Sequence, residues 1–90
     1  MSLKATVEGM ISDGYRERFI AEYQQVSIRE RNLSELVSAY KNNELEFEPD
    51  SPIELLDMQL DIMRAYKKIL KRRAQHEHII LKEVNEDDLK

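Results

Sequence analysis

Apolar residues follow helical spacing over a first long segment, from Tyr15 to Asn42, which contains no proline or glycine. They recur there at alternating steps of four and three, which places them on one face of an α-helix. The series consists of Phe19, Tyr23, Val26, Leu33, Val37 and Tyr40, with Glu30 at the step that it misses. This pattern predicts a helix over residues 15–42.

A second long helix is predicted over residues 52–78. Ser51, Pro52 and Glu54 have the order of a capping box, in which the serine caps the helix and proline takes its first position. Two apolar series then recur every seven residues, Leu56, Met63 and Leu70 in one and Leu55, Ile62 and Ile69 in the other. The heptad spacing is typical of helices that pack along their length.

The segment between the two predicted helices, residues 43–50, is short and predicts a sharp reversal of the chain. Leu45 and Phe47 alternate with glutamates, which favours an extended connection. A short connection makes the helices antiparallel neighbours, so the predicted fold is an all-α helical hairpin. The expected register pairs Leu33 with Met63, Glu30 with Tyr66, Val26 with Leu70, and Tyr23 with Arg73.

The remaining residues divide the chain around this hairpin. Residues 1–14 fit either a short helix or an N-terminal arm, residues 15–81 form the hairpin domain, and residues 82–90 are expected to be a disordered acidic tail. With 90 residues the chain forms one domain at most, and its own core is small.

The apolar stripe of the second helix is wider than one neighbouring helix can cover. Leu55, Ile62 and Ile69 lie beside the stripe that faces the first helix, and Met58 and Ile28 lie off the hairpin seam. We therefore predict that the chain forms a homo-oligomeric helical bundle, a dimer or higher, with these five residues at the interface.

Composition argues against several chemistries. The chain has no cysteine, so thiolate chemistry is excluded. His76 and His78 are two residues apart and do not share a helix face, unlike the pairs of helical zinc sites. No catalytic constellation or phosphate-binding glycine loop is present, so we expect no catalytic residue, no metal, no cofactor and no enzyme activity. No apolar run has the length of a membrane span, which predicts a cytoplasmic protein without membrane contact.

Basic residues concentrate near the end of the second predicted helix. Arg64, Lys67, Lys68, Lys71, Arg72 and Arg73 are six of the fourteen in the chain. Arg64, Lys68 and Arg72 share a face and, with Arg73 and Tyr66, are candidates for binding an anion such as a nucleotide. The alternative is helix electrostatics, because Glu54, Asp57 and Asp61 stand at the other end, as the helix dipole favours.

Acidic residues supply two further candidates. Glu30 interrupts the apolar seam, so we predict a buried carboxylate with Tyr66, Lys67 or Arg73 as its partner, either in a ligand pocket or as a contact that fixes the register. Residues 44–61 carry seven acids and no base. This block fits nucleic-acid mimicry or, alternatively, a solvated loop that leads into a helix N-terminus.

Four segments of the chain resemble a family of small proteins described as crAss-phage-related. These are YRERFIAEY at residues 15–23, LEFEP followed by SPIELL within 45–56, QLDIMRAY at 59–66, and LKRRA at 70–74. The resemblance implies a phage or prophage origin and a helical hairpin, and by association a role in host takeover or counter-defence. The chain departs from that pattern at His78, where such proteins often have glycine.

These observations lead to three hypotheses about function. The first is a non-catalytic, phage-encoded interaction module that self-associates and binds a host or phage protein. The second is an oligomeric sponge that sequesters an anionic nucleotide signal in the host cytoplasm. The third is a nucleic-acid-binding regulator, which the net charge of −4 and the absence of a helix-turn-helix signature disfavour.

Overall fold

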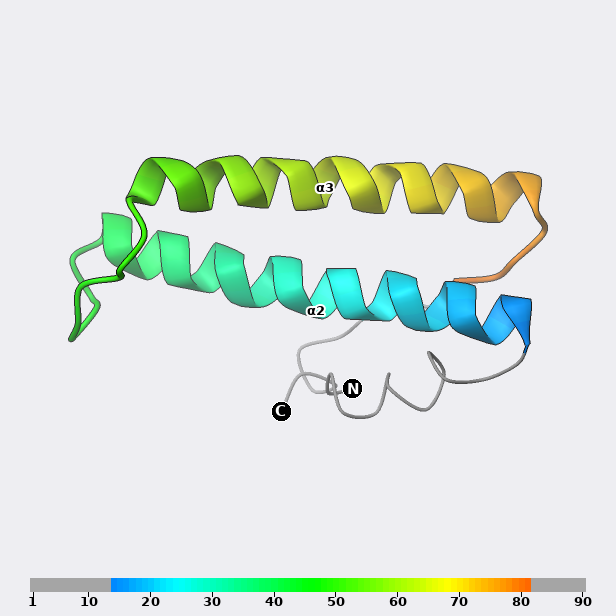
Figure 1. Ribbon diagram of the computed structural model, residues 1–90, viewed down its shortest axis with the longest axis horizontal. Helices are drawn as coiled ribbons and strands as arrows, with labels where there is room; N and C mark the ends of the chain where they lie inside the picture. Colours follow the sequence, from blue (N-terminus) through cyan, green and yellow to red (C-terminus); the bar gives the residue numbers. More distant parts are fainter. Residues whose placement is uncertain (1–13, 82–90) are drawn as a thin grey trace.

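Two antiparallel helices form the part of the molecule that a computed structural model describes, residues 14–81. Helix α2 spans Tyr15–Lys41 and helix α3 spans Ile53–His76, and they pack side by side along their length (Figure 1). No strand occurs within residues 14–81, so the predicted all-α hairpin is confirmed. The expectations for residues 1–13 and 82–90 lie outside the described residues.

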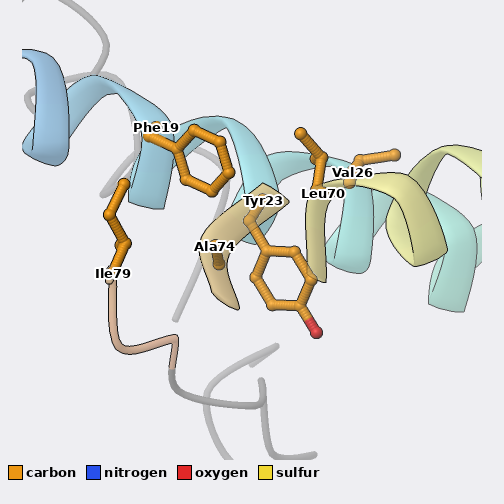
Figure 2. Packing of buried hydrophobic residues seen from close by; sticks show 6 residues of the cluster. All are labelled: Phe19, Tyr23, Val26, Leu70, Ala74 and Ile79. Carbon is orange, nitrogen blue, oxygen red and sulfur yellow. The ribbon is translucent and has the colours of Figure 1, made fainter. Parts of the chain in front are cut away.

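One cluster of buried residues lies toward the open end of the hairpin, while Val37 and Leu60 are buried nearer the connecting loop. Figure 2 shows the members of this cluster, which come from α2, from α3 and from the segment that follows α3: Phe19, Tyr23, Val26, Leu70, Ala74 and Ile79. Tyr23 and Leu70 are fully buried. Val26 and Leu70, which the predicted register pairs, both belong to this cluster.

The Arg73 guanidinium, which was expected beside Tyr23, lies over the Phe19 ring one helical turn earlier on α2. The Arg73 guanidinium lies 5.0 Å from the centroid of the Phe19 ring, whereas the cation over the Tyr23 ring is Lys67, at 5.9 Å. The reason is that the guanidinium can hydrogen-bond to Tyr15 and Glu77 at the open end while its flat face covers an aromatic ring.

Both helices end in the same backbone motif. The amide of Glu44 donates to the carbonyl of Ala39 at 2.8 Å, and the amide of Ile79 donates to the carbonyl of Ala74 at 2.8 Å. These are the six-residue closures of the Schellman motif, and each needs a left-handed residue just past the helix. Asn43 and His78 fill that place, with φ of 56° and 57°. His78 therefore stands where glycine is favoured.

The predicted cap at the start of the second helix is wrong. Pro52 holds the N-cap position, no side chain caps the helix, and the first helical residue is Ile53. The amides of Leu55 and Leu56 instead donate to the carbonyl of Pro52, at 3.0 and 3.3 Å. Proline fixes φ near −65° and brings this carbonyl into position without help from Ser51.

Candidate anion-binding groove

Four cations of α3 line one hollow on the side of the hairpin. Arg64, Lys67, Lys68 and Lys71 surround a space of about 160 Å³, which Glu30 of α2 closes from the opposite side. Steps of three and four residues keep these side chains on one face of α3. The periodicity of the helix thus concentrates positive charge beside the seam with α2.

Glu30 is the carboxylate that faces this cluster. Its side chain is 17% exposed, and its Oε1 lies 3.8 Å from Arg64 Nε and 3.9 Å from Lys67 Nζ. Glu30 was expected to be buried and is half-buried; it pairs with Lys67, one of the expected partners, and with Arg64, which sequence reasoning did not name. The Glu30 carboxylate is thus shared by two of the four cations that line the hollow.

Lys67 has the most enclosed position among the four cations. Its side chain is 20% exposed, and its ammonium lies between the Glu30 carboxylate and the Tyr23 ring. A half-buried ammonium is stabilised by such a carboxylate and by the negative face of an aromatic ring. Lys67 is thus held in place before any ligand arrives, which lowers the entropy lost on binding.

A second hollow continues along α2 from Glu30. It measures about 430 Å³ and is lined by polar groups of α2 and the start of the loop: Glu30, Arg31, Ser34, Glu35, Ser38, Ala39 and Glu44. Arg64 lies at the junction, because its Nη2 donates to the Ser34 hydroxyl at 3.3 Å. The two hollows share Glu30. Cations line the first, whereas two hydroxyls and three carboxylates line the second, and we call the two together the basic groove.

Sequence reasoning placed only part of this groove. Arg64 and Lys68 were predicted together and lie together, whereas Arg72, Arg73 and Tyr66 are not among the residues that line the hollow. Tyr66 is two positions from Arg64, and two positions turn a helix by about 200°. Lys67 and Lys71 were missed as site residues, although their steps of three and seven from Arg64 place them on its face.

Arg73 belongs instead to a polar cluster that joins the start of α2 to the end of α3. Its Nη2 donates to the Tyr15 hydroxyl at 3.0 Å and its Nε pairs with Glu77 at 3.2 Å, while the Tyr15 hydroxyl donates to Glu77. This donation lowers the pKa of the Glu77 carboxyl and raises the pKa of the Tyr15 phenol. We call these three residues the end clasp.

The groove lies within the part of the chain that resembles a known family. The model of the Sequestin family matches residues 13–76, which include both helices and every residue that lines the basic groove. The chain belongs to the Sequestin family. The comparisons give nothing that relates it to the crAss-phage-related proteins, and searches of curated proteins and of solved structures gave no match.

The match to Sequestin also covers the residues that were expected at an oligomer interface. Leu55, Met58, Ile62 and Ile69 lie on α3 and are 56–64% exposed, so they are free to meet another molecule. Ile28 is different, because it is 3% exposed and cannot serve as an exposed contact. Residues two apart on a helix point in nearly opposite directions. Because Val26 and Ile28 are both buried, α2 has buried residues on two of its sides.

Other site types find no support in the described part of this Sequestin chain. Within residues 14–81, no group of three or more histidines, cysteines, aspartates or glutamates is arranged to hold a metal ion. Neither α2 nor α3 has an apolar stretch of the length and hydropathy that crossing a membrane requires.

Proposed function

We propose that this Sequestin chain binds and sequesters a small phosphate-bearing ligand of the nucleotide class in the basic groove. The observation that carries the proposal is the convergence of Arg64, Lys67, Lys68 and Lys71 on one hollow in a chain of net charge −4. Helix electrostatics accounts for cations near a helix end but not for their gathering around one concave space. The name of the family, which speaks of sequestration, agrees with this function.

The groove offers different chemistry at its two ends. Arg64 presents a planar fork that suits two phosphate oxygens, and the lysines present point charges that suit a phosphate from several sides. The hydroxyls of Ser34 and Ser38 line the neighbouring hollow, where they suit the hydroxyls of a sugar. We therefore expect the phosphates at the Lys68 end and the nucleoside beyond Arg64.

Binding without turnover separates this proposal from an enzyme. Among the four cations of the first hollow no nucleophile stands beside a base, and the Glu30 carboxylate there pairs with two of these cations. A sequestering protein acts by affinity and copy number, so the bound ligand is expected to be recovered chemically unchanged after the protein is denatured.

Thermal unfolding in the presence of nucleotides tests the proposal. A panel of linear and cyclic nucleotides should contain at least one compound that raises the Tm of the wild-type chain, since a ligand that binds the folded state stabilises it. The double variant Arg64→Gln, Lys71→Gln should lose this rise in Tm. Added salt should weaken binding, because the contacts are ionic.

A matched double variant controls for net charge. Arg29→Gln with Arg72→Gln removes the same two positive charges from exposed positions outside the basic hollow. This variant should keep the rise in Tm. Equal losses in both double variants would show a nonspecific charge effect and contradict the groove, as would the absence of any rise across the panel.

A further inference from the structure

The outer face of α3 carries an apolar stripe that the hairpin leaves uncovered. Leu55, Ile62 and Ile69 recur every seven residues, and Met58 and Ala65 lie three residues after the first two. All five are exposed in the structure. Single exposed apolar residues are ordinary, but five at the a and d positions of successive heptads form one continuous seam. We call this set the outer stripe.

The outer stripe is separate from the face of α3 that packs on α2. The buried residues Leu60, Leu70 and Ala74 occupy two different heptad positions: Leu60 and Ala74 lie five residues after an a position, and Leu70 lies one residue after. By helical geometry these positions point away from the a and d positions by more than a right angle. The stripe is therefore not an extension of the core and remains open to a partner.

We propose that a second copy of this chain packs its α3 antiparallel on the outer stripe. The choice of a second copy rests on the charges that flank the seam. Glu54, Asp61 and Lys68 lie seven apart and border the stripe on one side, while Gln59, Tyr66 and Arg73 border it on the other. These flanking residues decide which partner helix and which direction are favourable.

In an antiparallel pair, each flank meets the same flank of the other copy. Asp61 of each copy then lies near Lys68 of the other, which gives two opposite-charge contacts related by a two-fold axis. In a parallel pair, the two different flanks meet, so that Asp61 faces Tyr66 and Lys68 faces Arg73, a like-charge contact. The surface is thus complementary to itself only in the antiparallel direction.

The same charges fix the register. Bringing Asp61 next to Lys68 of the other copy places Ile62 beside Ala65 and Met58 beside Ile69 across the seam. Small Ala65 opposite Ile62 leaves room for close approach of the two helices at the centre. Leu55 of one copy then meets the aliphatic stem of Arg72 of the other copy. The charged head of this Arg72 remains in solvent, near Glu54 of the first copy.

Disulfide trapping tests the direction and the register together. The chain has no cysteine, so single-cysteine variants report only the introduced contact. A mixture of Met58→Cys and Ile69→Cys chains should form the mixed disulfide faster than either homodimer, since antiparallel packing brings these two Cα atoms within reach. If Met58→Cys chains instead cross-linked preferentially to one another, the packing would be parallel and the proposal would be overturned.

Sedimentation of the 90-residue chain measures its association state and so tests whether it forms a dimer. The wild-type chain should sediment as a dimer, and Ile62→Glu should weaken association by at least about tenfold, because the symmetry axis places two buried charges at the centre. Ile80→Glu is the matched control: Ile80 is 87% exposed and lies outside the stripe, so this variant should remain dimeric. Circular dichroism should give equal helicity for all three chains, since Ile62 is exposed in the hairpin.

The remaining outcomes decide against the proposal. A monomeric wild-type chain would mean that the stripe serves a different partner or none, and equal weakening by both glutamate variants would place the interface elsewhere. The dimer and the proposed anion binding share Lys68, but none of the variants that test them changes this residue. Loss of the nucleotide-induced rise in Tm and loss of association are separate measurements on separate variants, so either proposal can fail alone.

Discussion

At the scale of single residues, His78 is the position where the sequence and the backbone agree least. Its φ of 57° lies in the left-handed region, which a side chain with a Cβ enters at a cost of about 1–2 kcal/mol. The fold requires this conformation because the Ile79 amide closes onto Ala74, and both residues belong to the buried cluster. The backbone of His78 is therefore strained in the folded chain.

Replacing His78 with glycine should stabilise the chain. The left-handed penalty disappears, and the greater freedom of glycine in the unfolded chain offsets part of the gain, so we expect about 0.5–1 kcal/mol of added stability. Urea unfolding followed by circular dichroism measures the change. Gln75→Gly, inside α3, is the control and should lose about 0.5–1 kcal/mol. Destabilisation by His78→Gly would show that the imidazole itself supports the turn.

At the scale of elements, the end clasp ties the first turn of α2 to the last turn of α3. Tyr15, Arg73 and Glu77 exchange hydrogen bonds there, and Arg16 Nη1 donates to the carbonyl of His78 at 3.0 Å. The other end of the hairpin is joined by Lys41 and Asp57, whose Nζ and Oδ2 are 3.1 Å apart. Polar contacts thus secure both ends of the seam, and apolar contacts fill it between them.

The end clasp should make stability depend on pH. The hydrogen bond from Tyr15 lowers the pKa of Glu77 in the folded chain below its ordinary value of 4.5. Its contribution to stability is therefore complete above that value and is lost as the pH falls through the lower, folded-state pKa. Tyr15→Phe removes the bond, so this variant should lose less stability than wild type between neutral pH and about pH 3.

Urea unfolding at several pH values measures this difference. Tyr40→Phe, which removes a phenol outside the clasp, is the control and should follow the wild-type pH profile. The same bond raises the pKa of Tyr15 above 10.0, so its contribution is lost again as the pH rises through that higher value. Parallel acid profiles for wild type and Tyr15→Phe would contradict the role of the clasp.

The two helices could be predicted from the sequence because their signals are local. Uninterrupted apolar spacing located α2 and α3 to within two residues at each end. The left-handed residue after α3 is His78, the position noted in the sequence as a histidine where glycine was expected. The cap at Ser51 failed because a proline carbonyl can serve the first amides alone. Arg73 and Tyr66 do not line the hollow with Arg64 and Lys68, because a run of cations does not reveal which side of the helix faces the hollow.

At the scale of the whole molecule, α3 serves three surfaces at once. One face packs on α2, a second lines the basic groove, and a third presents the outer stripe, while one cluster of buried residues lies toward the open end of the hairpin. A small core gives a single chain of this size limited stability. Association through the outer stripe would add the burial that the hairpin lacks, so folding and assembly are expected to be linked.

This linkage predicts a melting temperature that rises with protein concentration. When the dimer is the stable folded species, each tenfold increase in concentration favours it by about 1.4 kcal/mol, and the Tm increases accordingly. Calorimetry over a hundredfold range of concentration should detect the rise in wild type and in Ile80→Glu, and should find little or none in Ile62→Glu. If the wild-type Tm were independent of concentration, the hairpin would be stable alone, and the outer stripe would have no part in holding the fold together.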